Sequence, residues 1–224
     1  MPLAKRLYSP ENREENCRRL IHRSLGAFLT FMQVSGVLKV TVTGQENLRK
    51  TGGALIIANH PTLIDFIAIV GLIPEVNCLV KKSLVDHFFV RGAVRSSGYI
   101  VNDDPVNTVD SASRMIQGGT PVVIFPEGTR SPPGGLRKFK RGAATIANAT
   151  GCDVIPIYIT MNPPTLMKGQ KWYEIPPQRA HLTLQIASAK KNWSQKVPDG
   201  KRTFMSRKTN HTFRQYFQEQ QVNG

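Results

Sequence analysis

Short apolar runs alternate with helix-patterned segments along most of this chain, and that alternation constrains the fold more than any other feature. The runs are ALIIA at 54–58, PVVIF at 121–125 and VIPIYI at 154–159. An uninterrupted apolar run of this length fits a strand that is buried on both faces of a sheet. Strands that alternate with helices predict an α/β fold with a mostly parallel central sheet flanked by helices.

Two of the helix-patterned segments bear on the predicted site. Residues 62–73, TLIDFIAIVGLI, read as a mostly buried helix that follows a strand, with Pro61 at its first position. Residues 83–98, SLVDHFFVRGAVRSSG, carry one continuous helical pattern. Each of these helices is expected to return the chain to the start of the next strand.

The length of 224 residues fits one domain with short additions at its ends. We expect an N-terminal helical, membrane-associating segment over residues 1–38, with Ser9 or Asn12 as its cap. The α/β domain is predicted over residues 39–189. A basic tail ending in a helix is predicted over residues 190–224.

The expected membrane segment is not a clean apolar span. Residues 24–42 are mostly apolar but are interrupted by Gln33 and Lys39, so they fall short of the roughly 18 apolar residues of a spanning helix. Arginines precede the stretch, so it fits either a helix lying among lipid headgroups or a helix packed on the domain. The first twenty residues are too polar for the core of a secretory signal.

The charge balance is strongly basic, with 30 Lys plus Arg against 15 Asp plus Glu and a formal net charge of +15. Such a balance favours an anionic partner, whether nucleic acid, an acidic membrane leaflet or an acidic carrier protein. It is also compatible with a basic surface that only keeps the chain soluble. Charge alone does not choose among these alternatives.

The cysteines and most histidines carry no recognisable chemistry. Three widely spaced cysteines form no CxxC pair and no metal-ligand spacing, which favours burial in a reducing compartment over a nucleophilic cysteine. Four histidines have no companion residues at ligand spacing and are interpreted as surface or packing residues: His22, His87, His181 and His211. No metal site is predicted.

The stretch NHPTLID, residues 59–65, places two ionisable side chains inside an apolar region. His60 and Asp65 would diverge by about 140° on a regular helix. If His60 lies on the elbow between strand and helix, its ring can fold back toward Asp65. The aspartate would then fix the imidazole tautomer, and the free nitrogen could take a proton.

A second polar cluster, PEGTR, follows the apolar run PVVIF, so both clusters fall at strand ends, where α/β proteins bind ligands. The sequence has no GxSxG elbow, no phosphate loop, no GxGxxG and no HExxH. A His–Asp base without a protein nucleophile indicates that the activated hydroxyl belongs to the substrate. Acyl transfer to an alcohol fits this arrangement.

These blocks resemble those of the glycerolipid acyltransferases, the lysophosphatidate acyltransferase or PlsC-like family. NHPTLID is similar to the family's His-four-Asp signature, and FPEGTRS, residues 125–131, to its second hallmark. VIPIYI resembles its late Val-Pro strand, and KKSL, residues 81–84, its Lys-x-Glu-Leu block with Ser83 in place of glutamate. The resemblance covers residues 53–160 and implies a glycerol-3-phosphate acyltransferase-like fold.

The resemblance also implies roles. His60 would be the general base and Asp65 its orienting partner, while Lys82 and the four residues of the second motif would bind the acceptor: Glu127, Gly128, Thr129 and Arg130. Arg130 is suited to hold a phosphate or carboxylate. Alternatively, Glu127 and Arg130 could pair with each other and only brace a loop.

The implied reaction transfers a fatty acyl chain from acyl-CoA or an acyl-carrier protein to the hydroxyl of a lyso-lipid, in phospholipid biosynthesis. The acyl thioester is a co-substrate, and no further cofactor is implied. The expected partners are an anionic membrane surface, the donor and the lyso-lipid, with no nucleic acid. The expected location is the cytoplasmic side of a membrane, held peripherally or monotopically.

One block departs from the family pattern. The family's Gly-x-x-Phe-Ile-Asp-Arg stretch corresponds to GYIVNDD, residues 98–104, so Asp104 stands where a phosphate-binding arginine is expected. A carboxylate there would repel an acceptor phosphate. This predicts that lysophosphatidate is a poor acceptor and that a neutral or zwitterionic hydroxyl lipid is preferred.

Two other functions are also compatible with the sequence. The basic tail interleaves aromatic residues with Lys and Arg, which suits a module that binds lipid or single-stranded nucleic acid without catalysis. The hypothesis of a binding module leaves NHPTLID unexplained, and no RRM, KH or helix-turn-helix signature is present. A hydrolase could use the same dyad on water.

Overall fold

The structure, a computed structural model, describes residues 13–48, 52–86, 88, 90–171, 173–174 and 176–223. Ser9, Asn12 and His87 lie outside these residues. The helices are α2 Arg13–Val34, α3 Asp65–Leu72, α4 Lys82–Asp86, α5 Arg91–Ser97, α6 Pro105–Gln117, α7 Gly142–Thr150 and α8 Asp199–Asn223, with short 3-10 turns η2 Gln45–Leu48 and η3 Lys191–Trp193. The strands are β1 Leu38–Thr43, β2 Leu55–Ala58, β3 Asn77–Lys81, β4 Ile100–Asn102, β5 Val122–Ile124, β6 Val154–Asn162 and β7 Ala180–Ile186.

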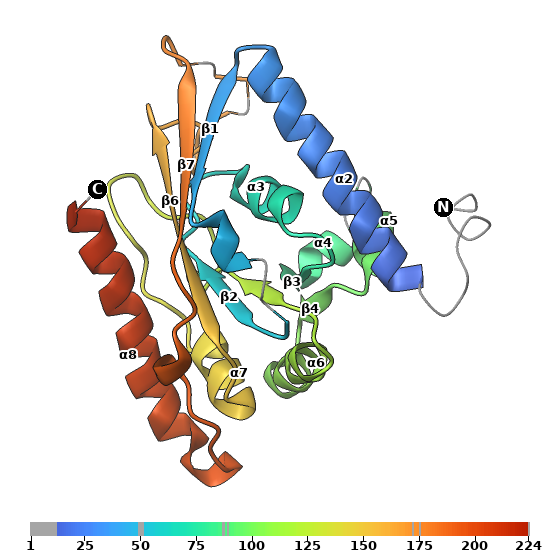
Figure 1. Ribbon diagram of the computed structural model, residues 1–224, viewed down its shortest axis with the longest axis vertical. Coiled ribbons are helices and arrows are strands. Elements are labelled where there is room, and N and C mark those ends of the chain that lie inside the picture. Colours follow the sequence, from blue (N-terminus) through green and yellow to red (C-terminus); the bar gives the residue numbers. More distant parts are fainter. Residues whose placement is uncertain are drawn as a thin grey trace.

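The strands form one seven-stranded sheet in the order β1-β7-β6-β2-β5-β3-β4 (Figure 1). Within the described residues, the strand pairs are parallel except for β6 and β7. The predicted α/β class with a mostly parallel sheet and an N-terminal helix is confirmed.

Strand β7 was not anticipated, although its sequence AHLTLQI alternates between buried and more exposed residues. That period of two is the usual signal of a strand with one buried face. The strand pairs with β1 on one side and β6 on the other, so it closes the gap between the first strand and the rest of the sheet.

The apolar runs are continuous because both faces of the central strands are covered. Leu55 and Ile57 of β2 join one buried cluster with residues of α6, α7 and α8. Ile56 and Ala58 point the other way, into a second cluster with residues of α2, α3 and α5. Successive side chains of a strand point to opposite faces, so an all-apolar strand fits only between two helical layers.

The helix after β2 begins later than the sequence predicts. Residues 62–64 lie in a bend after Pro61, and α3 starts only at Asp65. The amide of Thr62 donates to the Asp65 carboxylate and the amide of Leu63 donates to the Leu166 carbonyl. These contacts hold residues 61–64 in a non-helical turn, so Pro61 is not the first helical residue.

The predicted helix over 83–98 is two short helices, α4 and α5, and residues 88 and 90 between them lie in turns. A single helix of that length would be about 24 Å long. It has to connect β3 to β4, which have five and three residues and span only about 10–17 Å. Breaking the helix lets the connection return to the sheet over this shorter distance.

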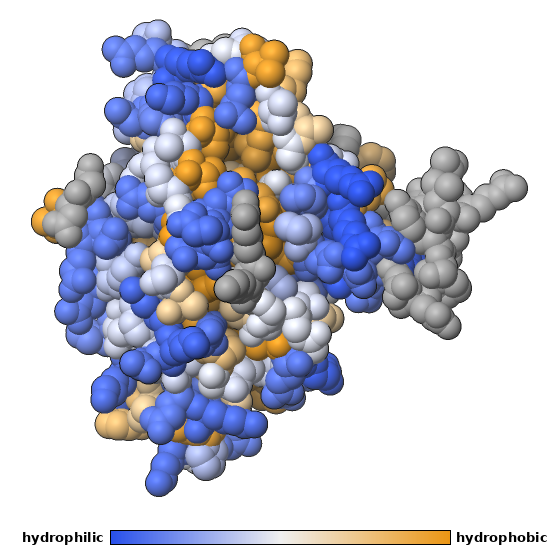
Figure 2. Space-filling view, in the orientation of Figure 1, coloured by the Kyte–Doolittle hydropathy of each residue, from blue (hydrophilic) through white to orange (hydrophobic). Residues whose placement is uncertain are grey.

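The apolar stretch 24–42 is divided between the end of α2 and strand β1. Among the described helices, none is both long enough and apolar enough to cross a membrane. The last turns of α2 nevertheless leave large apolar side chains in solvent, with Phe31 67% and Val34 83% exposed. Figure 2 shows this hydrophobic surface at the end of α2.

Candidate active site

Both predicted motifs follow strands that lie side by side in the sheet. His60 comes two residues after β2 and Glu127 three residues after β5, and these strands are parallel neighbours. The carboxyl ends of parallel strands lie at the same edge of a sheet, which is where α/β proteins bind ligands. Strand β3 adjoins β5 on its far side, so Lys82 at the start of α4 lies at this edge too.

His60 and Asp65 form the predicted pair. The distance from His60 Nδ1 to Asp65 Oδ2 is 2.9 Å, and the aspartate is fully buried while 19% of the histidine side chain is exposed. Thr62 donates to the same carboxylate from its amide and from its hydroxyl. With Nδ1–H donating to Asp65, the lone pair on Nε2 is the one left to accept a proton.

The electrostatics of Asp65 reflect its burial. Loss of solvent raises the pKa of the Asp65 carboxyl above its usual value, while the contact with His60 and the two donors of Thr62 act in the opposite direction. A buried carboxylate with several donors is held in one position. It can therefore fix the imidazole and stabilise a positive charge that forms on it.

Phe125 supports the histidine from a direction the sequence did not reveal. Its ring stacks on the imidazole, with 4.2 Å between centroids and 26° between the planes. Phe125 belongs to the second motif, and β2 and β5 place it beside the first. The stacked ring of Phe125 restricts tilting of the imidazole out of its plane. The hydrogen bond to Asp65 fixes which way Nδ1 points.

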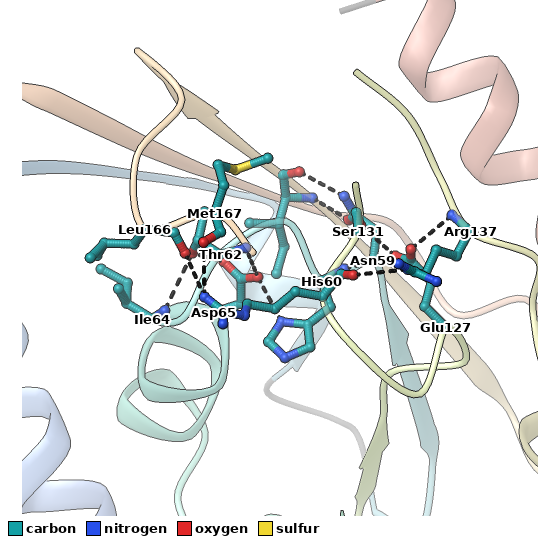
Figure 3. A network of polar contacts seen from close by, with 12 residues as sticks. Asn59, His60, Thr62, Ile64, Asp65, Glu127, Ser131, Arg137, Leu166 and Met167 are labelled. Atoms are coloured by element: carbon teal, nitrogen blue, oxygen red, sulfur yellow. Dashed lines mark hydrogen bonds and ion pairs between the residues drawn. The ribbon is translucent and has the colours of Figure 1, made fainter. Parts of the chain in front are cut away.

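Glu127 joins the two motifs. Its Oε1 accepts from the His60 amide at 3.0 Å and from the Ser131 hydroxyl at 2.7 Å, and its Oε2 accepts from the Arg137 amide at 2.9 Å. Only 2% of the residue is exposed. These donors occupy the carboxylate, so the geometry favours Glu127 as a residue that positions the His60 backbone (Figure 3).

Replacing Glu127 with glutamine should therefore lower both stability and turnover. The new amide group would face an N–H or O–H donor, and a buried polar group without a partner costs about 1–3 kcal/mol. We expect the melting temperature to fall by about 2–12 °C, measured by thermal unfolding. Glu219→Gln, an exposed change on α8, is the control; a Glu127→Gln melting curve that matches this control would contradict the bridging role.

Asn59 connects the NHPTLID motif to VIPIYI, the apolar run that forms most of β6. Its side-chain amide donates to the Ile159 carbonyl at 2.8 Å, and its oxygen accepts from the Ile159 amide at 2.7 Å. These bonds imitate one more step of the ladder between β2 and β6. These bonds fix the direction in which the chain leaves β2, and so they fix the position of the His60 backbone.

A loop that the sequence analysis left unassigned completes this edge. Residues 163–170 follow β6, and the Leu166 carbonyl accepts from both the Leu63 amide at 3.0 Å and Arg130 Nη1 at 3.1 Å. Nη1 also donates to the Met167 carbonyl at 3.1 Å. Arg130 is thus held by this loop, and the predicted alternative of a Glu127–Arg130 pair has no support in the contacts of either side chain. Nothing in the local sequence marks the loop, because its role depends on its position beside the two motifs.

The remaining residues of the second motif form a tight turn. Gly128 has φ +68°, a backbone conformation that favours glycine, and a Cβ there would lie 3.0 Å from Lys140 Nζ. Thr129 is half-buried in the same turn. Lys140, which the sequence analysis did not single out, therefore adds a second positive charge beside this motif.

Asp104 has a local structural role. Its carboxylate accepts from the Asn107 amide at 2.8 Å and caps α6. An aspartate is among the preferred N-cap residues, and the partial positive charge of a helix N-terminus offsets part of its own charge. The repulsion expected between Asp104 and an acceptor phosphate is weakened accordingly.

The other candidate groups lie in structural settings. Cys17 and Cys78 are buried and Cys152 is half-buried, and burial raises the pKa of the Cys78 and Cys152 thiols, which disfavours a thiolate. His22 contacts the Val70 carbonyl and His181 contacts Thr41. Across the described part of the chain, no cluster of three or more His, Cys, Asp or Glu is placed to hold a metal.

The sheet and the pair at its edge define an α/β protein with a His–Asp dyad. Among the contacts described above, no hydroxyl or thiol side chain bonds to the His60 ring. Residues 39–160, more than half of the chain, match the Acyltransferase family. The chain therefore belongs to the acyltransferase family, which confirms the resemblance drawn from the motifs.

Individual relatives agree with this assignment. A chloroplastic 1-acyl-sn-glycerol-3-phosphate acyltransferase of Arabidopsis thaliana is 30% identical over 146 residues, covering 62% of this chain and 41% of that protein. A 1-acyl-sn-glycerol-3-phosphate acyltransferase of Borreliella burgdorferi is 32% identical over 126 residues, covering 54% of this chain and 50% of its own length. The chain thus spans about half the length of these relatives.

The fold is also that of a solved structure. The crystal structure of the 1-acyl-sn-glycerophosphate acyltransferase PlsC from Thermotoga maritima superposes with a TM-score of 0.65 at 23% sequence identity. The match covers 88% of this chain and 80% of that one. The PlsC-like fold that the motifs predicted is confirmed.

Proposed function

We propose that this protein transfers a fatty acyl chain from an acyl thioester to the hydroxyl of a lyso-lipid, with His60 as general base. The observation that carries the proposal is the 2.9 Å contact between His60 and the fully buried Asp65 at the carboxyl edge of the sheet. Phe125 and Glu127 hold the same histidine from two further directions. A histidine fixed in this way is suited to proton transfer.

In the proposed reaction, His60 Nε2 takes the proton of the acceptor hydroxyl. The hydroxyl oxygen attacks the thioester carbonyl carbon at the same time. Asp65 stabilises the imidazolium that forms. The tetrahedral intermediate collapses, the C–S bond breaks, and the leaving thiolate takes the proton from the imidazolium. The products are the acylated lipid and the free thiol of the donor, and no covalent acyl-enzyme is needed.

For the acceptor, we propose a lysophosphatidate-type lipid. Relatives are named for 1-acyl-sn-glycerol-3-phosphate, and Arg130 and Lys140 supply positive charge beside the second motif. The loop carbonyls hold Arg130 by Nη1, which leaves its other nitrogens for an anion. The competing acceptor is a neutral or zwitterionic hydroxyl lipid, which the sequence analysis predicted because the Asp104 carboxylate would repel a phosphate.

Substitutions at Asp104 distinguish these acceptors. Asp104→Asn removes the charge but retains an N-cap residue, whereas Asp104→Arg also removes the cap. We expect Asp104→Asn to change the kcat/KM for lysophosphatidate by less than about threefold, because the carboxylate is already bound to the helix end. The assay compares lysophosphatidate with neutral and zwitterionic lyso-lipids, using one donor. A gain of about tenfold or more with lysophosphatidate alone would favour the repulsion hypothesis and the neutral acceptor.

We further propose that the protein works peripherally at the cytoplasmic face of a membrane, with the end of α2 in contact with lipid. Phe28 and Phe31 are exposed there beside Val34, and Arg23 precedes them on the same helix. Such a helix would lie at the headgroup boundary and be assisted by anionic lipid. High-salt or alkaline washing should therefore release a large fraction of the protein from membranes, measured by sedimentation. Retention in the pellet after both washes would contradict peripheral binding.

The non-catalytic alternative loses its main support in the structure. Phe213 and Phe217, two of the tail aromatics, are fully buried, and Trp193 and Tyr216 pack against the same cluster. Aromatic rings that are enclosed in a core cannot stack on nucleic acid bases. Phe204 is the one exposed ring among the tail aromatics that the structure describes, so the tail lacks the set of exposed rings on which that interpretation depended.

A further inference from the structure

A basic strip runs along one flank of α8 and the loop beside it. We define it as Lys138, Lys140, Arg141, Arg207 and Arg214, and all five side chains are exposed. The proposed reaction uses none of them except Lys140. The strip is therefore a charged surface whose role the dyad does not explain.

Two hydrogen bonds place the helix against the loop. Asn210 donates to the Phe139 carbonyl at 3.2 Å, and Gln221 donates to the Gly134 carbonyl at 3.1 Å. Arg207 and Arg214 are three before and four after Asn210, so they lie on nearly the same side of the helix. The two arginines therefore flank the loop that carries Lys138, Lys140 and Arg141.

The strip is continuous with the candidate active site. The amide of Lys140 donates to the Pro126 carbonyl at 2.7 Å, and its side chain lies over Gly128. The amide of Arg137, in the same loop, donates to Glu127. One short segment therefore connects the surface of α8 to the residue that positions His60.

The strip has little compensating negative charge. The acidic residues of α8 are Asp199 and Glu219. Asp199 is paired with Arg202, and Glu219, which accepts from Gln215, is 12 residues from Arg207 and so about 120° around the helix. Residues 128–141 contain no acidic residue. A surface of this kind attracts a partner that carries several negative charges.

One large apolar side chain accompanies these charges. Phe204 is 72% exposed and lies one turn before Arg207, in contrast to Phe213 and Phe217 on the inner side of the same helix. Interfaces between proteins commonly combine an aromatic contact with charged residues around it. A carrier protein with an acidic recognition helix would match both features.

The position of α8 argues against lipid as the occupant. Helix α2, with its exposed apolar end, packs on one face of the sheet, and α8 packs on the other (Figure 1). Figure 2 shows hydrophilic surface along α8 in the view that shows apolar surface at the end of α2. If α2 contacts the membrane as proposed, the strip stays accessible to a soluble partner.

We propose that the basic strip is the docking surface for an acidic acyl-carrier protein, which presents the acyl thioester to His60. This inference rests on the proposed function, since the carrier is the acyl donor in that reaction. Docking on α8 and the loop would place the carrier beside Gly128, and its flexible prosthetic arm would cover the remaining distance to the dyad.

The test reverses charge on the strip. In Arg207→Glu/Arg214→Glu the strip loses two positive charges and gains two negative ones. Lys201→Glu/Lys208→Glu is the matched control, because these exposed lysines have the same seven-residue spacing on the same helix but lie about 120° away. Rates are measured with palmitoyl-loaded acyl-carrier protein and, separately, palmitoyl-CoA, and thermal unfolding shows that both variants fold.

We expect the strip variant to raise the KM for the loaded carrier protein by at least about tenfold, because like charges now face each other, while the control changes it by less than about threefold. The KM for palmitoyl-CoA should change little. An equal rise for both donors would assign the strip to the phosphates of CoA and overturn the proposal. Loss of binding to anionic vesicles, with carrier kinetics unaltered, would assign it to lipid and would also overturn it.

Direct binding separates failure of this inference from failure of the proposed function. Titration calorimetry of the wild type with the carrier protein should show binding that weakens in the strip variant and at high salt. Activity with palmitoyl-CoA but no carrier binding would overturn the docking surface and leave acyl transfer standing. Carrier binding without transfer from either donor would instead overturn the proposed function.

Discussion

Replacing His60 with alanine or glutamine should reduce acyl transfer by about 10²–10⁴-fold while the fold is retained. General-base catalysis contributes about 10²–10⁴ to a rate, and neither replacement can take the proton that Nε2 would accept. The loss cannot be made up by a neighbouring base, because Asp65 is fully buried behind the histidine and Glu127 is occupied by its three donors.

The effect on stability should be small in comparison. His60 is partly exposed, and its principal packing contact is the stacked ring of Phe125, which is worth about 0.5–1.5 kcal/mol. Turnover is measured by transfer of a labelled acyl chain, and folding by thermal unfolding. His211→Ala, which removes an exposed histidine on α8, is the control. Turnover of a His60 variant within a few-fold of the wild type would refute the base assignment.

Asp65→Asn should lower the rate by about 10²–10⁴-fold with little change of shape. The amide oxygen can take the place of Oδ2, which accepts from His60 and from the Thr62 amide, and the amide nitrogen can donate to the Thr62 hydroxyl. What the variant lacks is the negative charge that stabilises the imidazolium. The loss should therefore appear in kcat more than in stability.

Thr62→Val tests whether the rate depends on the charge of Asp65 or on the geometry of the turn that holds it. It removes the hydroxyl that donates to Asp65 but keeps the Thr62 amide and the carboxylate. We expect a loss of no more than about tenfold, measured in the same assay. If Thr62→Val lowered turnover as much as Asp65→Asn, the geometry of the turn would control the rate. An Asp65→Asn enzyme with wild-type turnover would show that the aspartate has only a structural role.

The sequence by itself determined the class of fold and the central pair of the site. Apolar runs between helical patterns require two covering layers, and the clusters on either side of β2 have that arrangement. The elbow between strand and helix brought His60 and Asp65 together because they are only five residues apart. Both inferences depend on local geometry, which periodicity and turn chemistry record.

Only the tertiary structure decided what surrounds that pair. Asn59 bonds to Ile159, the His60 amide to Glu127, and Arg130 to Leu166, across separations of 100, 67 and 36 residues. The start of α3 and the burial of the tail aromatics were also set by such distant contacts. The periodicity of one segment shows which of its faces is buried, but not which strand or loop covers that face. These neighbours follow from the order of strands in the sheet, and no local pattern in the chain encodes that order.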